Sequence, residues 1–477
     1  MKAALPTSAD IKRIFFKQQR KKNVLPEHAV LTNELNDVIR NLRGRLALLD
    51  EGNSKERLNA ELRRVLEQKK VIEESYFEQQ AENVTDYILN QPSTIRLSKS
   101  TYEGREITTL NKRRPTITLF DRFVSQTLAS SYRIRSRGRD HIIQNVLNAL
   151  RMTAGSKEAT RSIVKIDIRE FFKTIDHELL QRKLSSHSGV PQFALRHVGA
   201  ILDAYERIYR RKSGIPQGVP SSSMLSEIYM ESLDDRLKQH PNVILYVRYV
   251  DDILIISDGD SAESIVRYVD ELLNRLNLSR NESKSVIISH SDNAARAISR
   301  FDYLGYQFRF SADTRQLETI DISYAKLTRY VTAVDRLKSF AQNSLCWNDE
   351  QGVRKFLDAY EYLVFPHYSS GDADSLRIVS GLAYSAKYII DSERPGENIK
   401  KFVNRINGTI GQVVTSVICG APNSIECGCC QKPVAKVEKL RRYFDVPCSY
   451  EDVMKSPAMP HLDDTIRRES RRLLWNS

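Results

Sequence analysis

The sequence predicts an α+β fold: an antiparallel sheet with carboxylates at its edge, followed by a helical C-terminal part. The first observation is a run of apolar residues, 245–256, mostly β-branched or aromatic, that is interrupted only by Arg248, Asp251 and Asp252, as expected for a hairpin with an acidic turn. The second is a similar apolar run that ends at Asp167. The third is the helical spacing of apolar residues from about 318 onward, which indicates a helical region after the sheet.

The N-terminal part is expected to begin with a basic, partly mobile segment, residues 1–25. Apolar residues then follow helical spacing between 31 and 46, and again between 58 and 66, with a break at 50–53 that contains a glycine. This pattern predicts a helical hairpin in front of the sheet. We interpret the hairpin as a packing element without a catalytic role.

The three aspartates at the strand ends predict a metal site. A carboxylate buried without a partner is costly, and a divalent metal ion repays that cost because it prefers hard oxygen ligands. Two-metal phosphoryl transfer needs carboxylates from at least two chain segments, holding ions about 3.5–4 Å apart. Asp251 and Asp252 supply one segment and Asp167 supplies the second. Taken alone, the adjacent pair would also fit a solvated acidic turn.

Between these segments lies a sequence rich in glycine and proline, residues 214–223. Its two glycines and two prolines predict a rigid loop, and the apolar spacing from Met224 onward predicts a helix after it. Such a loop can approach a nucleotide closely, although an ordinary strand-to-helix turn has the same composition. The long insert between Asp167 and Asp251 is otherwise expected to be mostly helical.

In this order, the segments resemble the motifs of reverse transcriptases. Residues 167–172 are similar to the first catalytic palm motif, 214–218 to the Pro-Gln-Gly motif, and 249–252 to the Tyr-x-Asp-Asp box. Residues 281–284 resemble the lysine motif, and 301–306 the primer-grip hairpin. Ahead of them, 114–126 resemble the fingers segment of bacterial reverse transcriptases. The resemblance extends over roughly residues 95 to 310.

The resemblance implies a right-hand polymerase fold, with fingers and an antiparallel palm sheet followed by a helical thumb and C-terminal domain. It divides the chain into an N-terminal helical extension (1–94), the fingers and palm (95–310), a helical thumb (311–400) and a basic C-terminal region (401–477). The basic runs of the last region can follow a nucleic acid backbone or form a solvated helix face.

The family's catalytic residues carry over onto Asp167, Asp251 and Asp252. The resemblance implies that these aspartates, with Ile168 beside them as a further metal position, bind two Mg²⁺ ions, for which Mn²⁺ is a potential substitute. It also places the primer grip at the turn of the later hairpin, at Leu304 and Gly305.

The nucleotide-binding residues implied by the resemblance lie in four segments. Phe172 stands where the family has its sugar gate, which favours deoxynucleotides, although a core aromatic beside Phe171 is the alternative. Gln217 is expected near the incoming sugar and base. Arg114 is the candidate for the triphosphate, because a guanidinium fork suits phosphate oxygens, with Lys112 and Arg113 as competitors. Lys284 is expected to assist the departing pyrophosphate, with a plain surface lysine as its alternative.

The implied activity is that of an RNA-directed DNA polymerase, a nucleotidyltransferase that adds deoxynucleotides to a primer. Its expected partners are an RNA template, the DNA product and deoxynucleoside triphosphates. An RNA-dependent RNA polymerase shares the palm, but Phe172 and the Pro-Gln-Gly motif argue against it. A non-catalytic subunit would have no reason to keep three costly carboxylates.

The sub-family follows from motifs that the sequence lacks. Retron signatures, the endonuclease pattern of many intron enzymes and a ribonuclease H carboxylate set are not evident. What remains resembles the defence-associated, abortive-infection group of bacteria, which acts against phage with a non-coding RNA or a protein primer, and which implies partner proteins from the same operon. The alternative is a group II intron-type or other retroelement reverse transcriptase and maturase that binds and folds RNA.

Composition agrees with a nucleic acid partner. The 477 residues include 73 Lys and Arg against 60 Asp and Glu, a formal charge of +13, and phosphate contacts supply most sequence-independent affinity. The start of the chain has no apolar core typical of a signal peptide, and no apolar stretch approaches the roughly 20 residues that span a bilayer. We therefore expect a cytoplasmic protein without a membrane partner, and leave a homo-oligomer open.

Six cysteines are too few for a disulfide scaffold in a chain of this length. Five of them gather late in the sequence, at 419, 427, 429, 430 and 448, with His461 beyond. Their Cys-x-Cys-Cys spacing differs from the paired Cys-x-x-Cys of common zinc sites, so a structural zinc site and simple thiols both remain open.

Overall fold

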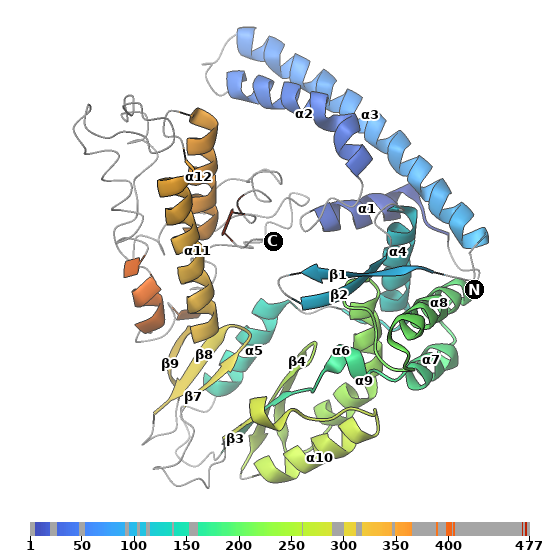
Figure 1. Ribbon diagram of the computed structural model, residues 1–477, viewed down its shortest axis with the longest axis vertical. Helices are drawn as coiled ribbons and strands as arrows, with labels where there is room; N and C mark the ends of the chain where they lie inside the picture. The colour runs from blue at the N-terminus through green and yellow to red at the C-terminus, as the bar shows by residue number, and fades with distance from the viewer. Residues whose placement is uncertain are drawn as a thin grey trace. The chain divides into compact units, whose positions relative to one another are not determined.

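The computed structural model describes most of the chain up to residue 364, drawn as coloured ribbon in Figure 1. The described ranges are 5–19, 26–46, 53–90, 95–102, 105–110, 115–135, 138–151, 161–259, 261–288, 300–311, 317–345, 349–364, 388–389, 397–402, 404–405, 470 and 473–474. Two compact units interleave along the chain. Unit 1 comprises Met1–Ser136, Ile168–Asp235 and Glu271–Ser279, and unit 2 comprises Arg137–Asp167, Arg236–Asp270 and Arg280–Ser477.

Unit 1 begins with three helices, α1 (Ser8–Gln19), α2 (Pro26–Leu46) and α3 (Asn53–Leu89). Helices α2 and α3 lie side by side (Figure 1), which confirms the predicted helical hairpin. Within the segment that we expected to be basic and partly mobile, Ser8–Gln19 form a helix. Ile11, Ile14 and Phe15 share one face of α1 and are buried, and the rings of Phe15 and Phe77 lie 5.3 Å apart. Burial of this apolar face outweighs the basic composition of the segment.

The remainder of unit 1 is a two-stranded hairpin and a set of helices. Strands β1 (Leu97–Tyr102) and β2 (Arg105–Leu110) pair antiparallel. The helices are α4 (Pro115–Ser131), α6 (Phe171–Thr174), α7 (His177–Ser186), α8 (Gln192–Tyr209) and α9 (Ser222–Lys238), whose last three residues belong to unit 2. Leu110, Ile117, Ile201 and Val219 share one buried cluster, which joins β2, α4, α8 and the segment before α9. The insert between the aspartates is thus mostly helical, as predicted.

Unit 2 contains the four-stranded sheet that carries the aspartates. Its strands are β3 (Arg161–Asp167), β4 (Val243–Tyr249), β5 (Asp252–Asp258) and β6 (Val286–Ile288), in the antiparallel order β4-β5-β3-β6. Residues 253–256 of β5 are fully buried on both faces, which explains why this strand is apolar without alternation. Helix α5 (Arg139–Arg151) buries Ile142 and Val146 in the same cluster as Leu254 and Ile256.

Two further elements complete the region around this sheet. Helix α10 (Ala262–Asn274) begins in unit 2 and ends in unit 1, and the short 3₁₀ helix η1 (Glu282–Lys284) precedes β6. No helix in the described ranges is both long and apolar enough to cross a membrane.

In the described residues from 300 to 364, unit 2 continues with a three-stranded sheet and two long helices. Strands β7 (Arg300–Tyr303), β8 (Tyr306–Phe310) and β9 (Leu317–Ile322) follow one another in the sheet, and α11 (Tyr324–Asn343) and α12 (Glu350–Val364) follow β9. We expected helix from about 318, but the chain first forms β9 because it completes the sheet against β8. Ser323 then caps α11, since its hydroxyl accepts the Lys326 N–H at 3.3 Å.

Candidate active site

The carboxylates meet at one end of the four-stranded sheet. Asp167 is the last residue of β3 and Asp252 is the first of β5, and the two are direct cross-strand partners. Side chains that lie opposite each other in an antiparallel pair point to the same face, with Cβ atoms about 4.5–5.5 Å apart. Two like charges in this arrangement repel each other, so the sheet holds them against their electrostatic preference.

Asp251 lies in the two-residue turn that joins β4 to β5. Tyr249 and Asp252 are the last pair of the ladder, which leaves Val250 and Asp251 as the central turn residues. Val250 has a φ of 63°, an unusual value for a β-branched residue. Val250 is the first central residue of the turn, and a positive φ at that position alone is the pattern of a type II′ turn. Arg248 donates a hydrogen bond to the Val250 carbonyl at 2.9 Å and supports the turn.

The electrostatics of this edge favour a bound cation. Burial raises the pKa of Asp251, and the negative charges of Asp252 and Asp167 raise it further. Burial also raises the pKa of Asp252, with Asp167 adding to the effect, while Lys165 and Lys284 oppose it. Both pKa values remain raised despite these lysines, so the positive charges of the protein only partly offset burial and repulsion, and a bound cation would stabilise the ionised carboxylates.

Two residues of the predicted lysine motif reach Asp167. The Asn281 side chain donates to Asp167 Oδ2 at 3.1 Å, and its backbone N–H donates to the Asp167 carbonyl at 2.8 Å. The Lys284 Nζ lies 3.9 Å from the same Oδ2, on a side chain that is 68% exposed. Asn281 therefore fixes the orientation of Asp167, while Lys284 supplies a mobile positive charge beside it.

The donor chemistry at this edge fits divalent metal ions, because carboxylate oxygens are the ligands that Mg²⁺ and Mn²⁺ prefer. Among the described residues, however, no group of three or more His, Cys, Asp or Glu side chains lies close enough together to hold an ion as it stands. Ile168 directly follows Asp167 and buries its apolar side chain. The only oxygen that Ile168 can offer a metal ion is its backbone carbonyl. The two-metal centre stays a prediction.

Phe172 and Gln217 lie in unit 1, where the structure brings their segments together. The Ile215 N–H donates to the Phe172 carbonyl at 2.7 Å, which fastens the Gln217 loop, residues 214–221, to α6. Phe171 is buried in the core, whereas Phe172 is only half-buried and meets it edge-on, with ring centroids 5.5 Å apart. Gln217 is exposed. Both side chains are thus partly accessible, as residues that contact a nucleotide must be.

The predicted primer-grip residues form a second tight turn in unit 2. Leu304 and Gly305 connect β7 to β8, with φ values of 48° and 87°. Positive φ at both central positions is the type I′ pattern of two-residue hairpins. The Gly305 carbonyl accepts the Ser323 N–H at 3.0 Å, which joins this turn to the start of α11.

A lysine that the sequence did not single out lies beside that turn. Lys326 Nζ is 4.9 Å from the centroid of the Tyr306 ring, and burial, with Arg139 as a further cause, lowers its pKa to about 8. The sequence held no signal for Lys326, since its surroundings come from strands and helices far apart in the chain. Arg114, its competitors Lys112 and Arg113, the late cysteines and His461 lie outside the described residues.

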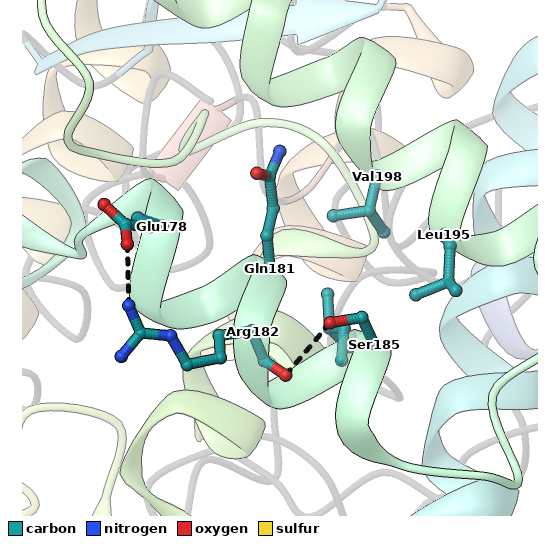
Figure 2. Close-up of a pocket in the computed structure, with 7 residues that line it drawn as sticks. Glu178, Gln181, Arg182, Ser185, Leu195 and Val198 are labelled. Carbon is teal, nitrogen blue, oxygen red and sulfur yellow. Dashed lines mark hydrogen bonds and ion pairs between the residues drawn. The ribbon is translucent and has the colours of Figure 1, made fainter.

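None of these residues lines the hollow drawn in Figure 2. It is a cleft of about 490 Å³ between α7 and α8 of unit 1. The Arg182 side chain donates to Glu178 at 2.6 Å, and the Ser185 hydroxyl donates to the backbone carbonyl of Arg182 at 3.2 Å. Leu195 and Val198 of α8 line the opposite side. With no unpaired charge among its lining residues, the cleft offers less chemistry than the carboxylates do.

Comparison with known proteins agrees with the order of the motifs. Residues 105–308 match the family model of the reverse transcriptase (RNA-dependent DNA polymerase). The COX1/OXI3 intron 1 protein of Saccharomyces cerevisiae is 23% identical over 255 residues, and the retron Ec73 reverse transcriptase of Escherichia coli is 26% identical over 109 residues. These matches cover 40% and 22% of this chain, and 30% and 34% of the two relatives. The chain therefore matches only about a third of the length of each.

Among solved structures, apo telomerase from Candida tropicalis aligns with 84% of this chain and 68% of its own, at 12% identity and a TM-score of 0.42.

The family match covers β2 to β8 and therefore includes all three aspartates, Phe172, Gln217 and Lys284. The mixture of helices and antiparallel sheets confirms the predicted fold class. Residues 105–308 are a reverse transcriptase domain, the domain of RNA-directed DNA polymerases.

Proposed function

We propose that the protein is an RNA-directed DNA polymerase that adds deoxynucleotides to a primer with two divalent metal ions, Mg²⁺ or Mn²⁺. The observation that carries the proposal is the register of β3 and β5, which sets Asp167 opposite Asp252 and leaves Asp251 in the adjoining turn. Two chain segments thereby contribute carboxylates to one edge of one sheet, as two-metal phosphoryl transfer requires.

Each residue has a role in this proposal. Asp167, Asp251 and Asp252 hold the ions, with the Ile168 carbonyl as a further ligand, and Asn281 keeps Asp167 in its orientation. When bound, the ions would lower the pKa of the primer hydroxyl and neutralise the leaving pyrophosphate. The exposed Lys284 side chain can turn from Asp167 toward that pyrophosphate.

The nucleotide and primer contacts belong to the same proposal. Phe172 excludes the 2′-hydroxyl, Gln217 lies along the incoming sugar and base, and Arg114 pairs with the triphosphate. Leu304 and Gly305 hold the primer end. RNA is the template and deoxynucleoside triphosphates are the substrates, which agrees with the formal charge of +13.

The decisive experiment is primer extension on an RNA template, with each nucleotide type and with Mg²⁺, Mn²⁺ or chelator. We expect DNA synthesis that requires the metal and falls about 10³-fold in Asp251→Ala or Asp252→Ala, since metal stabilisation is worth several kcal/mol and about 1.4 kcal/mol is tenfold. Both variants should keep the wild-type fold by circular dichroism. Near-normal DNA synthesis by a folded Asp251→Ala protein would contradict the catalytic role proposed for Asp251.

For the biological role, we propose bacterial anti-phage defence in the cytoplasm, with a non-coding RNA or a protein as primer and with proteins from the same operon as partners. The support is the resemblance of the chain to defence-associated reverse transcriptases and the similarity to a retron enzyme from a bacterium. A homo-oligomer would be compatible with this role.

A maturase or other retroelement enzyme is the second candidate, and the similarity to a yeast intron-encoded protein favours it. A maturase acts by binding and folding RNA, so its activity does not need the carboxylates. RNA that copurifies with the chain should be sequenced from cells that carry wild type and the Asp251→Ala variant. Intron RNA bound equally by both, together with stimulated splicing, would favour the maturase.

A further inference from the structure

A fully buried polar cluster lies in unit 1, whereas the three aspartates of the candidate site belong to unit 2. Its members are Asp121 of α4, His197 of α8 and Ser221, the residue directly before α9, and each of them is 0% exposed. An ionised carboxylate in such a place is costly unless donors surround it. The cluster therefore exists at an energetic cost that an apolar contact between the same three segments would avoid.

The donors converge on Asp121. The Ser221 hydroxyl donates to Oδ1 at 2.6 Å, and the Ser221 backbone N–H donates to Oδ2 at 2.8 Å. His197 Nε2 lies 3.0 Å from Oδ1. Although a nucleophilic triad contains the same residue types, its serine bonds to the imidazole and faces the substrate. Here the serine donates to the carboxylate and is buried, so the arrangement can position a segment but cannot attack a substrate.

The segment that this cluster holds is the Gln217 loop, of which Ser221 is the last residue. At the loop's other end, Gly214 N–H donates to the Ile175 carbonyl at 2.7 Å, beside the Ile215 bond to α6. In the middle, the Pro216 carbonyl accepts the Ser222 hydroxyl at 2.6 Å. The loop is thus fastened on both sides of Gln217, whose side chain remains exposed.

On its other side, the loop lies against the hairpin formed by β1 and β2. A Cβ added to Gly218 would lie 2.7 Å from the Thr108 carbonyl oxygen of β2. Because the loop cannot retreat in that direction, the bond between Ser221 and Asp121 determines where its C-terminal end lies. A buried polar network of this kind specifies one arrangement, whereas apolar packing would accept several.

We propose that Asp121 is a positioning residue that acts through Ser221 to hold the Gln217 loop, and thereby sets how tightly the protein binds a deoxynucleotide. This inference rests on the proposed polymerase function. In this proposal, Asp121 acts on the nucleotide only through the position of Gln217.

The matched test compares Ser221→Ala with Ser226→Ala. Both serines are buried at 0% exposure, but the Ser226 hydroxyl donates to the Ser223 carbonyl within its own segment, at 2.8 Å. Ser221→Ala should raise the KM for deoxynucleotides about tenfold, as expected when a hydrogen bond to a charged group is lost, with kcat nearly unchanged. Ser226→Ala should change neither constant. Equal effects of the two substitutions would overturn the proposal.

A double-mutant cycle tests whether the effect passes through Gln217. In a Gln217→Ala background, Ser221→Ala should raise the KM by much less than it does in the wild-type chain, because the positioned side chain is already gone. If the two effects multiply independently, Ser221 acts by another route and the proposal is wrong. Asp121→Asn, which keeps the size of the side chain, serves as the second variant if Ser221→Ala does not fold.

Hydrogen exchange of the full-length protein separates this inference from the proposed function. The backbone amides of the five non-proline residues in 214–220 should exchange faster in Ser221→Ala than in Ser226→Ala and wild type, and this measurement requires no catalysis. Unchanged exchange would overturn the inference even in an active polymerase. Faster exchange in a chain without polymerase activity would support the positioning role while contradicting the proposed function.

Discussion

At the scale of single residues, the site is defined by charges that the protein alone does not balance. Asp167 and Asp252 face each other across two strands, and Asp251 follows within the turn. The pKa values of Asp251 and Asp252 are both raised, by burial first and then by their negative neighbours. The carboxylates that suit a metal ion therefore destabilise the metal-free protein at this end of the sheet.

The first prediction concerns Asp251→Asn without metal. Because the folded-state pKa of Asp251 is raised, its contribution to stability is present below the unfolded pKa of about 4 and is lost as pH rises through the folded value. At pH 7 in chelator, Asp251→Asn should therefore melt about 1–2 °C above wild type, a modest gain because the group is only half-buried. The difference should vanish near pH 4 and should reverse when Mg²⁺ is added.

Thermal unfolding followed by circular dichroism at both pH values checks this expectation. Lys284→Ala is the opposite control, since removal of a positive charge beside Asp167 should lower the melting temperature at pH 7. A lower melting temperature for Asp251→Asn in chelator would show that the turn carboxylate is not under electrostatic strain.

The second prediction concerns sugar choice. Phe172→Ala should raise the ratio of ribonucleotide to deoxynucleotide incorporation about ten- to a hundredfold, the range expected when a pocket loses a steric contact, with part of DNA synthesis retained. Phe171→Ala is the matched control. It removes a buried ring and should lower stability by about 3–5 kcal/mol without a change in the ratio. A constant ratio in Phe172→Ala would make this ring a core residue.

Residue-level prediction succeeded where the pattern was local. Asp167, Asp251 and Asp252 stand out because each interrupts or ends an apolar strand. Asn281 lies in a segment that the sequence marked, yet its bond to Asp167 joins residues 114 positions apart and could not be deduced. The Asp121 to Ser221 contact spans 100 positions for the same reason. The sequence shows that these polar residues are present, but only the folded structure shows which residues they contact.

At the scale of elements, tight turns and glycines decide how the site is placed. Gly218 lies against the backbone of β2, with the Thr108 carbonyl 2.7 Å and a Thr109 methyl carbon 2.8 Å from the position of an added Cβ. Since β2 is paired with β1 along its length, the strand cannot yield easily. The Gln217 loop can therefore lie this close to β2 only because Gly218 has no side chain.

The third prediction compares two glycine substitutions. Gly218→Ala should cost about 1–3 kcal/mol of unfolding free energy through overpacking, and should loosen the Gln217 loop. Gly199→Ala, in the interior of α8 with no atom within 4 Å of the added Cβ, should instead stabilise the protein by about 0.5–1 kcal/mol. Denaturant titrations of both proteins give the comparison. Equal stabilities would mean that the loop moves freely away from β2.

Elements with strong periodicity were predicted, and those that tertiary contacts create were not. Helices α2, α3, α11 and α12 follow from apolar spacing, and the acidic hairpin from two β-branched runs. Strand β9 was missed because six residues of mixed polarity become a strand only beside β8. Helix α1 was missed because three apolar residues within a basic segment acquire a partner only when α3 is present.

At the scale of the whole molecule, the predicted domains follow one another along the chain, whereas the two compact units interleave. The predicted domain boundaries stay predictions. The excess of positive charge, +13, belongs to the entire chain and should make its affinity for RNA fall steeply with salt. The proposed role in defence likewise concerns the whole protein, together with the partner proteins and the RNA that we propose for it.

The fourth prediction concerns that role. Expression in a bacterium, together with neighbouring genes and any adjacent non-coding RNA, should restrict some phages by at least about tenfold in plating efficiency. The Asp251→Ala, Asp252→Ala double variant should not, because the proposed metal-held carboxylates would make the DNA product. Cells that lack the gene are the baseline. Equal protection by wild type and double variant would exclude a DNA product as the effector.

The position of β3 in the middle of its sheet also has a consequence for protein synthesis. β3 ends at Asp167, but its two neighbours are β5 and β6, and β6 ends at Ile288. At about 5–20 residues per second, the ribosome needs roughly 6–24 s to add the intervening segment. Until β5 is complete at Asp258, both edges of β3 are unpaired, and the edge that pairs with β6 stays unpaired for the rest of the interval. An unpaired strand edge is prone to association with other chains. Chaperone binding should therefore be strongest for nascent chains that have passed Asp167 and have not yet reached Ile288.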